Sequence, residues 1–130
     1  MKAIGSFMRE LSASSGKFHP HLHYDESMGC LQVLLRNCDI REVEVSRSFD
    51  VLKNNHPQNK KGNIAGFILW GARGMLYDQG YTKSSISLEH LIKRFERHNN
   101  LPHNTSVFGR YDEYVLRIAR KHQFVWHISE

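Results

Sequence analysis

The sequence feature that most constrains this chain is the stretch 64–80, the most apolar segment of an otherwise polar sequence. Its first part, Ile64 to Trp70, is a short continuous apolar run, typical of a strand buried on both faces. Gly71 would end this strand, and Gly80 would close a short helix over 72–79 at the C′ position. Apolar residues also recur at helical spacing, but a single helix would contain three internal glycines, each costing about 1 kcal/mol relative to alanine. We therefore predict a buried strand followed by a short helix.

Length and composition are those of a small globular domain. The chain has 130 residues, 40% of them hydrophobic, which suffices for one core in one domain. No apolar span reaches about 18 residues, and the N-terminal residues lack the apolar run of a signal peptide. The two cysteines, Cys30 and Cys38, form no metal-binding pattern and are expected to be reduced thiols. We therefore expect a cytoplasmic protein that does not engage a membrane.

The N-terminal half alternates between helical and extended patterns. Residues 2–11 place their apolar side chains at helical spacing and predict an amphipathic helix. Residues 21–36 look extended, and residues 42–46 alternate strictly between polar and apolar positions. We predict that these two segments pair as an antiparallel hairpin. Residues 48–56 are predicted as a single helical turn.

The C-terminal half is mainly helical. Ser87 is a typical N-cap, and apolar residues recur at helical spacing in the segment that follows it and ends at Asn99. A second helix is predicted over 111–122 and a short final strand over 124–128. Together these elements predict a single α+β domain spanning residues 1–130, in which a small antiparallel sheet carries helices packed on one face.

Part of this pattern resembles a family of small uncharacterised β-rich domains, which share a Tyr-Asp pair, two alternating strands and a Gly-x-x-Ile-Leu strand. The residues that carry the resemblance, within about residues 21–72, are His23-Tyr24-Asp25-Glu26, Leu31, Val33, Leu35, Val43, Val45 and Gly66-Phe67-Ile68-Leu69. The resemblance implies a small antiparallel sheet and no activity.

A positive charge excess suggests an anionic partner. The formal net charge is +5, and basic residues recur on the polar sides of the two C-terminal helices. We predict a non-enzymatic binding module that engages nucleic acid or a nucleoprotein through these residues, with no cofactor. The candidate binding residues are Lys60, Lys61, Lys93, Arg94, Arg97, Arg110, Arg117, Arg120 and Lys121. Aromatic residues that could stack on bases are Tyr81, Tyr111 and Trp126.

Other interpretations remain open. Glu89, Glu96, Asp112 and Glu113 could neutralise the basic residues and leave two ordinary solvated helix faces. The chain could then be an inhibitor or adaptor that binds an acidic protein and has no chemistry of its own. A metal-free ribonuclease could use His122, His127, Arg120 and Tyr114. If residues 19–23 are extended, His19, His21 and His23 would share a face, so they are the candidate metal ligands in a chain otherwise expected to bind none.

Overall fold

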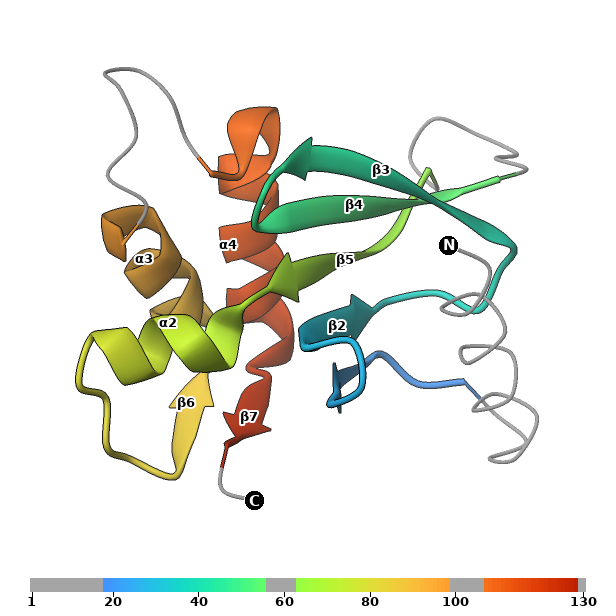
Figure 1. Cartoon of the computed structure of the whole chain (residues 1–130). Coiled ribbons are helices and arrows are strands. Elements are labelled where there is room, and N and C mark those ends of the chain that lie inside the picture. Colours follow the sequence, from blue (N-terminus) through green and yellow to red (C-terminus); the bar gives the residue numbers. More distant parts are fainter. Residues whose placement is uncertain (1–17, 56–62, 99–106, 129–130) are drawn as a thin grey trace.

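The computed structural model describes residues 18–55, 63–98 and 107–128 (Figure 1). The predicted helix over 2–11 and the two lysines Lys60 and Lys61 lie outside these residues. The strands are β1 (His21–Asp25), β2 (Cys30–Leu34), β3 (Ile40–Ser46), β4 (Phe49–Asn54), β5 (Ile64–Trp70), β6 (Ser85–Ser87) and β7 (Val125–His127). The helices are α2 (Ala72–Asp78), α3 (Leu88–His98), the short 3-10 helix η2 (Gly109–Tyr111) and α4 (Asp112–His122).

The central apolar stretch forms the middle strand of the main sheet and the helix that follows it. The five-stranded sheet has the order β1-β2-β5-β4-β3, and every neighbouring pair is antiparallel. Five consecutive residues of β5, 65–69, are buried, as expected for a strand covered on both faces. The chain ends α2 with hydrogen bonds from Gly80 N to Tyr77 O and from Tyr81 N to Leu76 O. The prediction of a strand followed by a short helix is confirmed.

The predicted hairpin between residues 21–36 and 42–46 is wrong. Residues 21–36 contain two strands, β1 and β2, which pair with each other, and β2 takes β5 as its second neighbour. The unrecognised turn lies between Asp25 and Cys30. Asp25 Oδ1 accepts hydrogen bonds from the backbone N–H groups of Ser27 and Met28, and Gly29 supplies the positive φ of 69° that completes the reversal.

The helical turn predicted for residues 48–56 is also wrong, because this segment contains β4. Phe49 and Val51 point toward the helices, whereas Asp50 and Leu52 point to the other face of the sheet. The strand pairs with β3 on one side and with β5 on the other. Its conformation is therefore set by long-range pairing, which local spacing does not reveal.

The helices α2, α3 and α4 all pack on one face of the main sheet, so the predicted α+β architecture is confirmed (Figure 1). Apolar side chains from β2, β4 and β5 meet those of the three helices in one continuous core. Ser87 Oγ accepts a hydrogen bond from His90 N at 3.1 Å and caps α3, as predicted. The largest fully buried side chains of this core include Phe49, Phe67, Phe95 and Phe108.

A second, smaller cluster lies on the opposite face of the sheet. Its buried members are Cys30, Leu34, Leu52 and Ile68. The sheet is therefore apolar on both faces, and β5 contributes to each of them.

The C-terminal strand β7 pairs with β6 in a two-stranded ribbon and also contacts the edge of the main sheet. Trp126 of β7 stacks on Tyr24 of β1, with ring centroids 5.1 Å apart. The Cζ atom of Arg73 in α2 lies 4.5 Å from the centroid of the same tyrosine ring, and Arg73 Nη2 donates a hydrogen bond to Ile128 O. Three segments distant in sequence are thus held together at one corner of the molecule.

Within residues 18–55, 63–98 and 107–128, no helix combines the length and apolar character needed to cross a membrane. Both cysteines are free thiols, Cys30 buried in β2 and Cys38 in the loop after it.

The backbone of β5 approaches that of β2 most closely at Gly66, and this generates the first prediction. A Cβ added at Gly66 would lie 2.1 Å from the carbonyl oxygen of Val33, and the φ of Gly66 is 155°. Neither the carbonyl nor the central strand can move without breaking the sheet. We expect Gly66→Ala to lower the free energy of unfolding by at least about 3 kcal/mol, measured by urea denaturation.

Gly74→Ala is the matched control, because no heavy atom lies within 4 Å of the Cβ that it would add and the residue is in α2. Alanine there should raise the free energy of unfolding by up to about 1 kcal/mol. Equal effects of the two substitutions would contradict the proposed close approach.

Candidate nucleic-acid interface

Seven of the nine predicted binding residues lie within the described part of the chain, on α3, η2 and α4. Helices α3 and α4 run antiparallel, so that Glu89 at the start of α3 lies beside Arg120 near the end of α4. Six of the seven side chains are exposed, and Arg94 is half-buried. The structure thus places these residues at the surface, but it divides six of them into three groups with different surroundings and holds the seventh, Arg94, in contacts of its own.

The first group forms a mixed-charge seam between α3 and α4. Glu89 accepts a hydrogen bond from Arg120 Nε at 2.9 Å and forms an ion pair with Lys93 at 3.3 Å. The hydrogen bonds from Arg120 and Lys93 lower the pKa of Glu89. Part of the predicted basic surface is therefore already neutralised by an acidic side chain of the same chain.

Two further acids lie farther along these helices. Burial, and then the charge of Asp112, raise the pKa of Glu96. Of the four acids that the sequence offered as neutralising partners, Glu89 therefore contacts basic residues of the predicted surface, and Glu96 and Asp112 lie close to each other.

Arg94 is built into the fold. Its guanidinium donates to Gln79 Oε1 at 2.7 Å and to His90 Nε2 at 3.1 Å, and it lies 4.6 Å from the centroid of the Tyr81 ring. Gln79 Nε2 donates in return to Arg94 O. These contacts join the end of α2 to the middle of α3, so Arg94 and Tyr81 are engaged in packing.

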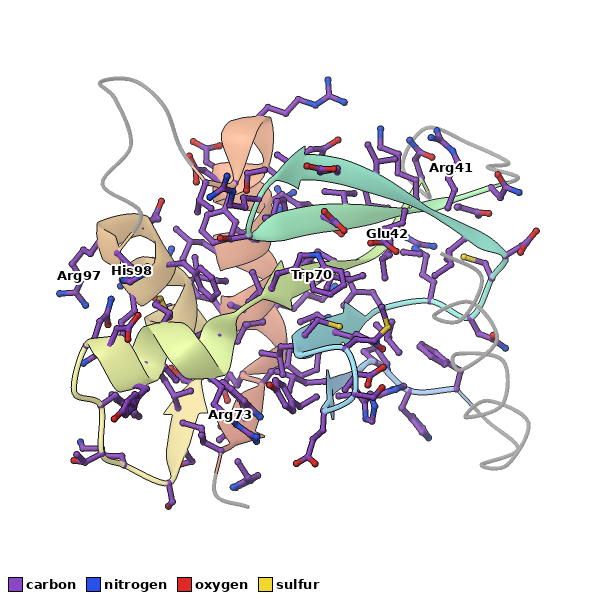
Figure 2. The ribbon with its side chains drawn as sticks, viewed as in Figure 1. Arg41, Glu42, Trp70, Arg73, Arg97 and His98 are labelled. Atoms are coloured by element: carbon purple, nitrogen blue, oxygen red, sulfur yellow. The ribbon has the colours of Figure 1, made fainter. Side chains whose placement is uncertain are left out.

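The second group points away from the sheet. Arg97 lies with His98 at the outer end of α3 (Figure 2), and Lys121 is exposed in the last turn of α4. Arg97 lies in the last turn of α3 and Lys121 in the last turn of α4. Because the two helices are antiparallel, these turns lie at opposite ends of the helix pair, and the two residues do not form a compact cluster.

The third group gathers around two tyrosines and is the candidate interface. We call it the basic–aromatic cluster, and its members are Arg36, Lys53, Arg110, Arg117, Tyr111 and Tyr114. Arg110 Cζ lies 5.2 Å from the centroid of the Tyr111 ring, and its NH2 group donates to Tyr111 Oη at 3.1 Å. Arg117 Cζ lies 5.6 Å from the centroid of the Tyr114 ring. Both arginines are exposed and both tyrosines are half-buried.

The pKa values of the two tyrosines reflect this arrangement. Burial alone would raise the pKa of Tyr111, but hydrogen bonding by Arg110 and the positive charge of Lys53 outweigh it, so the pKa is lowered. Burial raises the pKa of Tyr114, while the charges of Arg36 and Arg117 act in the opposite direction. Both phenols therefore sit in a positive electrostatic field that comes from four segments of the chain.

The fold explains how these segments meet. Tyr111 packs against Phe49 of β4, with ring centroids 6.2 Å apart, which sets the start of α4 over the sheet. Lys53 lies near the end of β4, and Arg41 of β3 is its direct cross-strand partner. Arg36 follows the end of β2. Cations from the ends of the strands thus reach the first turn of α4.

Arg36, Arg41 and Lys53 were missed by sequence analysis. A hairpin of residues 21–36 with 42–46 and a helical turn over 48–56 would not bring these basic residues near α4. Residues 49–54 carry only a weak strand pattern, which is the one sequence signal that could indicate Lys53.

The other face of the sheet carries a polar group that the sequence did not indicate. Trp70 of β5 and Glu42 of β3 are labelled in Figure 2. Trp70 Nε1 donates to Asp50 Oδ2 at 2.9 Å, and Glu42 interacts with the same aspartate. Burial, and then Asp50, raise the pKa of Glu42 to about 7. Glu42 therefore carries a proton below neutral pH.

Two more buried polar groups lie on this face. The Oε1 atom of Gln32 has no hydrogen-bond partner within the part of the chain that the structure describes, and its Nε2 lies 3.8 Å from Cys30 Sγ. Burial raises the pKa of Cys30 to about 11, so this thiol stays protonated at neutral pH and is a poor nucleophile.

The three candidate metal ligands are not gathered at one point. His19 precedes β1 and is exposed, while His21 and His23 lie within the strand. Among the described residues no group of three His, Cys, Asp or Glu side chains could hold a metal ion. The extended segment that would align all three histidines begins only at His21.

The residues considered for a ribonuclease have separate surroundings. His122 stacks on Phe124, with ring centroids 5.1 Å apart, and His127 is exposed on β7. Arg120 donates to Glu89, and Tyr114 lies under Arg117. Of the aromatic residues considered for stacking, Tyr111 alone belongs to the basic–aromatic cluster, since Tyr81 contacts Arg94 and Trp126 contacts Tyr24.

No protein-family model, curated protein or solved structure matches this chain. The resemblance of residues 21–72 to a family of small β-rich domains therefore stays a prediction.

The contacts of Arg94 predict a structural role. Arg94→Ala removes two hydrogen bonds and the contact with Tyr81, and should lower the free energy of unfolding by about 1–2 kcal/mol. Arg97→Ala, one turn away and exposed, should change it by less than about 0.5 kcal/mol. Urea denaturation measures both, and an equal cost would show that Arg94 is not held as described.

The carboxyl pair predicts a pH-dependent stability. The folded-state pKa of Glu42, about 7, lies above its unfolded value, so Glu42 favours folding at low pH. This contribution is lost as the pH rises through 7. The side chain introduced by Glu42→Gln cannot ionise, so the variant does not lose this contribution. The melting temperature of the variant minus that of wild type should therefore increase from pH 5 to pH 8.

Glu113→Gln is the control, because Glu113 is exposed on α4 and does not lie on the strands that carry Glu42 and Asp50. Its melting temperature relative to wild type should change little over that range. The same pH dependence in both variants would argue against a raised pKa of Glu42 in the folded state.

Proposed function

We propose that this protein is a non-enzymatic module that binds nucleic acid, or a nucleoprotein, through the basic–aromatic cluster. The observation that carries the proposal is the gathering of four cations, from the loop after β2 and from β4, η2 and α4, around Tyr111 and Tyr114. Arginine binds phosphate oxygens in a bidentate manner, and several cations in a row can follow a phosphate backbone. Two of the residues proposed from sequence, Arg110 and Arg117, are central to this site.

The proposal separates the predicted residues by their surroundings. Lys93 and Arg120 already contact Glu89, and Arg94 is held by Gln79, so an anionic ligand would have to compete with these partners. Arg110 and Arg117 contact tyrosine rings, and neither forms an ion pair with an acidic side chain among the residues that the structure describes. The cluster is therefore the better phosphate site.

A charge-reversal experiment tests the site. We expect the triple variant Arg36→Glu, Arg110→Glu and Arg117→Glu to weaken binding of labelled oligonucleotides strongly. The slope of log affinity against log salt should fall by about three units, one for each lost phosphate contact. Fluorescence anisotropy with short labelled DNA and RNA at several salt concentrations gives both quantities.

The matched control is the triple variant Arg47→Glu, Arg97→Glu and Lys121→Glu. It makes the same change in net charge at three exposed positions outside the cluster. We expect a much smaller loss of affinity and an almost unchanged salt slope. Equal losses in the two variants would show that net charge alone, and not the cluster, drives binding.

The competing function is an inhibitor or adaptor that binds an acidic protein. If wild-type protein shows no salt-dependent binding to DNA or RNA, nucleic-acid binding is excluded and this second function takes its place. Recovery of partners from lysate with and without nuclease separates the two in the same way.

A further inference from the structure

We infer that the basic–aromatic cluster recognises single-stranded nucleic acid, because each of its two arginines lies against a tyrosine ring, and nucleobases can stack on arginine and tyrosine side chains. This inference rests on the proposed function and narrows its ligand. Arg110 lies over Tyr111 and Arg117 over Tyr114, at 5.2 Å and 5.6 Å from the ring centroids.

The tyrosines hold the arginines in place. Tyr111 is itself fixed by its contact with Phe49 and receives a hydrogen bond from the Arg110 NH2 group at 3.1 Å. An arginine backed in this way loses less side-chain entropy when a ligand binds than one that projects freely into solvent. Bases stack on aromatic rings and on arginine planes, and stacking is tolerant of sequence.

The spacing of the two arginine–tyrosine pairs suits an open strand. Arg110 and Arg117, on which the bases would stack, are seven residues apart, which is about two helical turns and about 10 Å along the axis. That step exceeds the ~3.4 Å between stacked bases along one strand of a duplex. A strand whose bases are partly unstacked can stretch to this distance, whereas a duplex keeps its base faces covered.

The surrounding charges supply the backbone contacts. Lys53 and Arg36 lie near the phenols of Tyr111 and Tyr114, and Arg41 lies beside Lys53 on the next strand. A strand that stacks two bases on Arg110 and Arg117 would thus pass its phosphates over cations from the strand ends.

The test compares three labelled probes with the full-length protein: a 12-nucleotide single strand, the same length of abasic strand, and a 12-base-pair duplex. The abasic strand keeps its phosphates and lacks its bases. We expect wild type to bind the intact single strand at least about tenfold more tightly than the abasic strand. Binding to the duplex should be weaker than to the intact single strand.

The decisive variant is Arg110→Lys with Arg117→Lys, which keeps both charges and removes both planar groups. It should reduce the ratio of intact to abasic affinity toward one and leave the salt slope unchanged. Arg97→Lys, an exposed arginine outside the cluster, should leave the ratio as in wild type.

The outcomes separate the two proposals. Salt-dependent binding that is equal for intact and abasic strands, or a ratio that survives the double lysine substitution, overturns the single-strand inference and leaves nucleic-acid binding standing. An absence of salt-dependent binding to all three probes overturns both.

Discussion

The hydrogen bonding of β5 to a neighbour on each side is the interaction on which the rest of this structure depends. The hairpin β1–β2 and the hairpin β3–β4 share no hydrogen-bonded neighbour except this strand. Its side chains enter the large core on one face of the sheet and the smaller cluster on the other. At Gly66 the strand backbone lies too near β2 for any Cβ, so the sheet is close-packed where it is also most buried.

Elements with a purely local signature could be predicted from sequence. The run of 64–70 and the glycines that follow it specify a buried strand and a short helix without reference to any partner. The α3 helix combines an N-cap with one apolar face, and α4 has the same kind of face. The pairing of the strands could not be predicted, because the turn at Asp25–Gly29 lies inside a segment that reads as continuous, and β4 has no strong pattern of its own.

The same distinction between local signals and long-range contacts applies to the candidate site. Basic residues on helices α3 and α4 were identifiable from spacing, and Arg110 and Arg117 were among them. The partners that distinguish one arginine from another come from elsewhere in the chain, as with Gln79 for Arg94 and Glu89 for Arg120. Lys53 and Arg36 join the site only through the position of α4 across the strand ends, which no local pattern encodes.

The place of β5 in the strand order has a consequence for how the chain folds. Each hairpin closes over a short loop and can form early, whereas β5 must insert between two strands that precede it in sequence. Until it does, β2 and β4 each have one open edge, and isolated two-stranded hairpins are marginal in water. During synthesis both hairpins emerge before their common neighbour. Because β5 follows β4 closely in sequence, the pairing of β2 with β5 joins the most distant segments of this sheet. We expect this pairing to form last and to set the interval in which the chain is most exposed to wrong pairing.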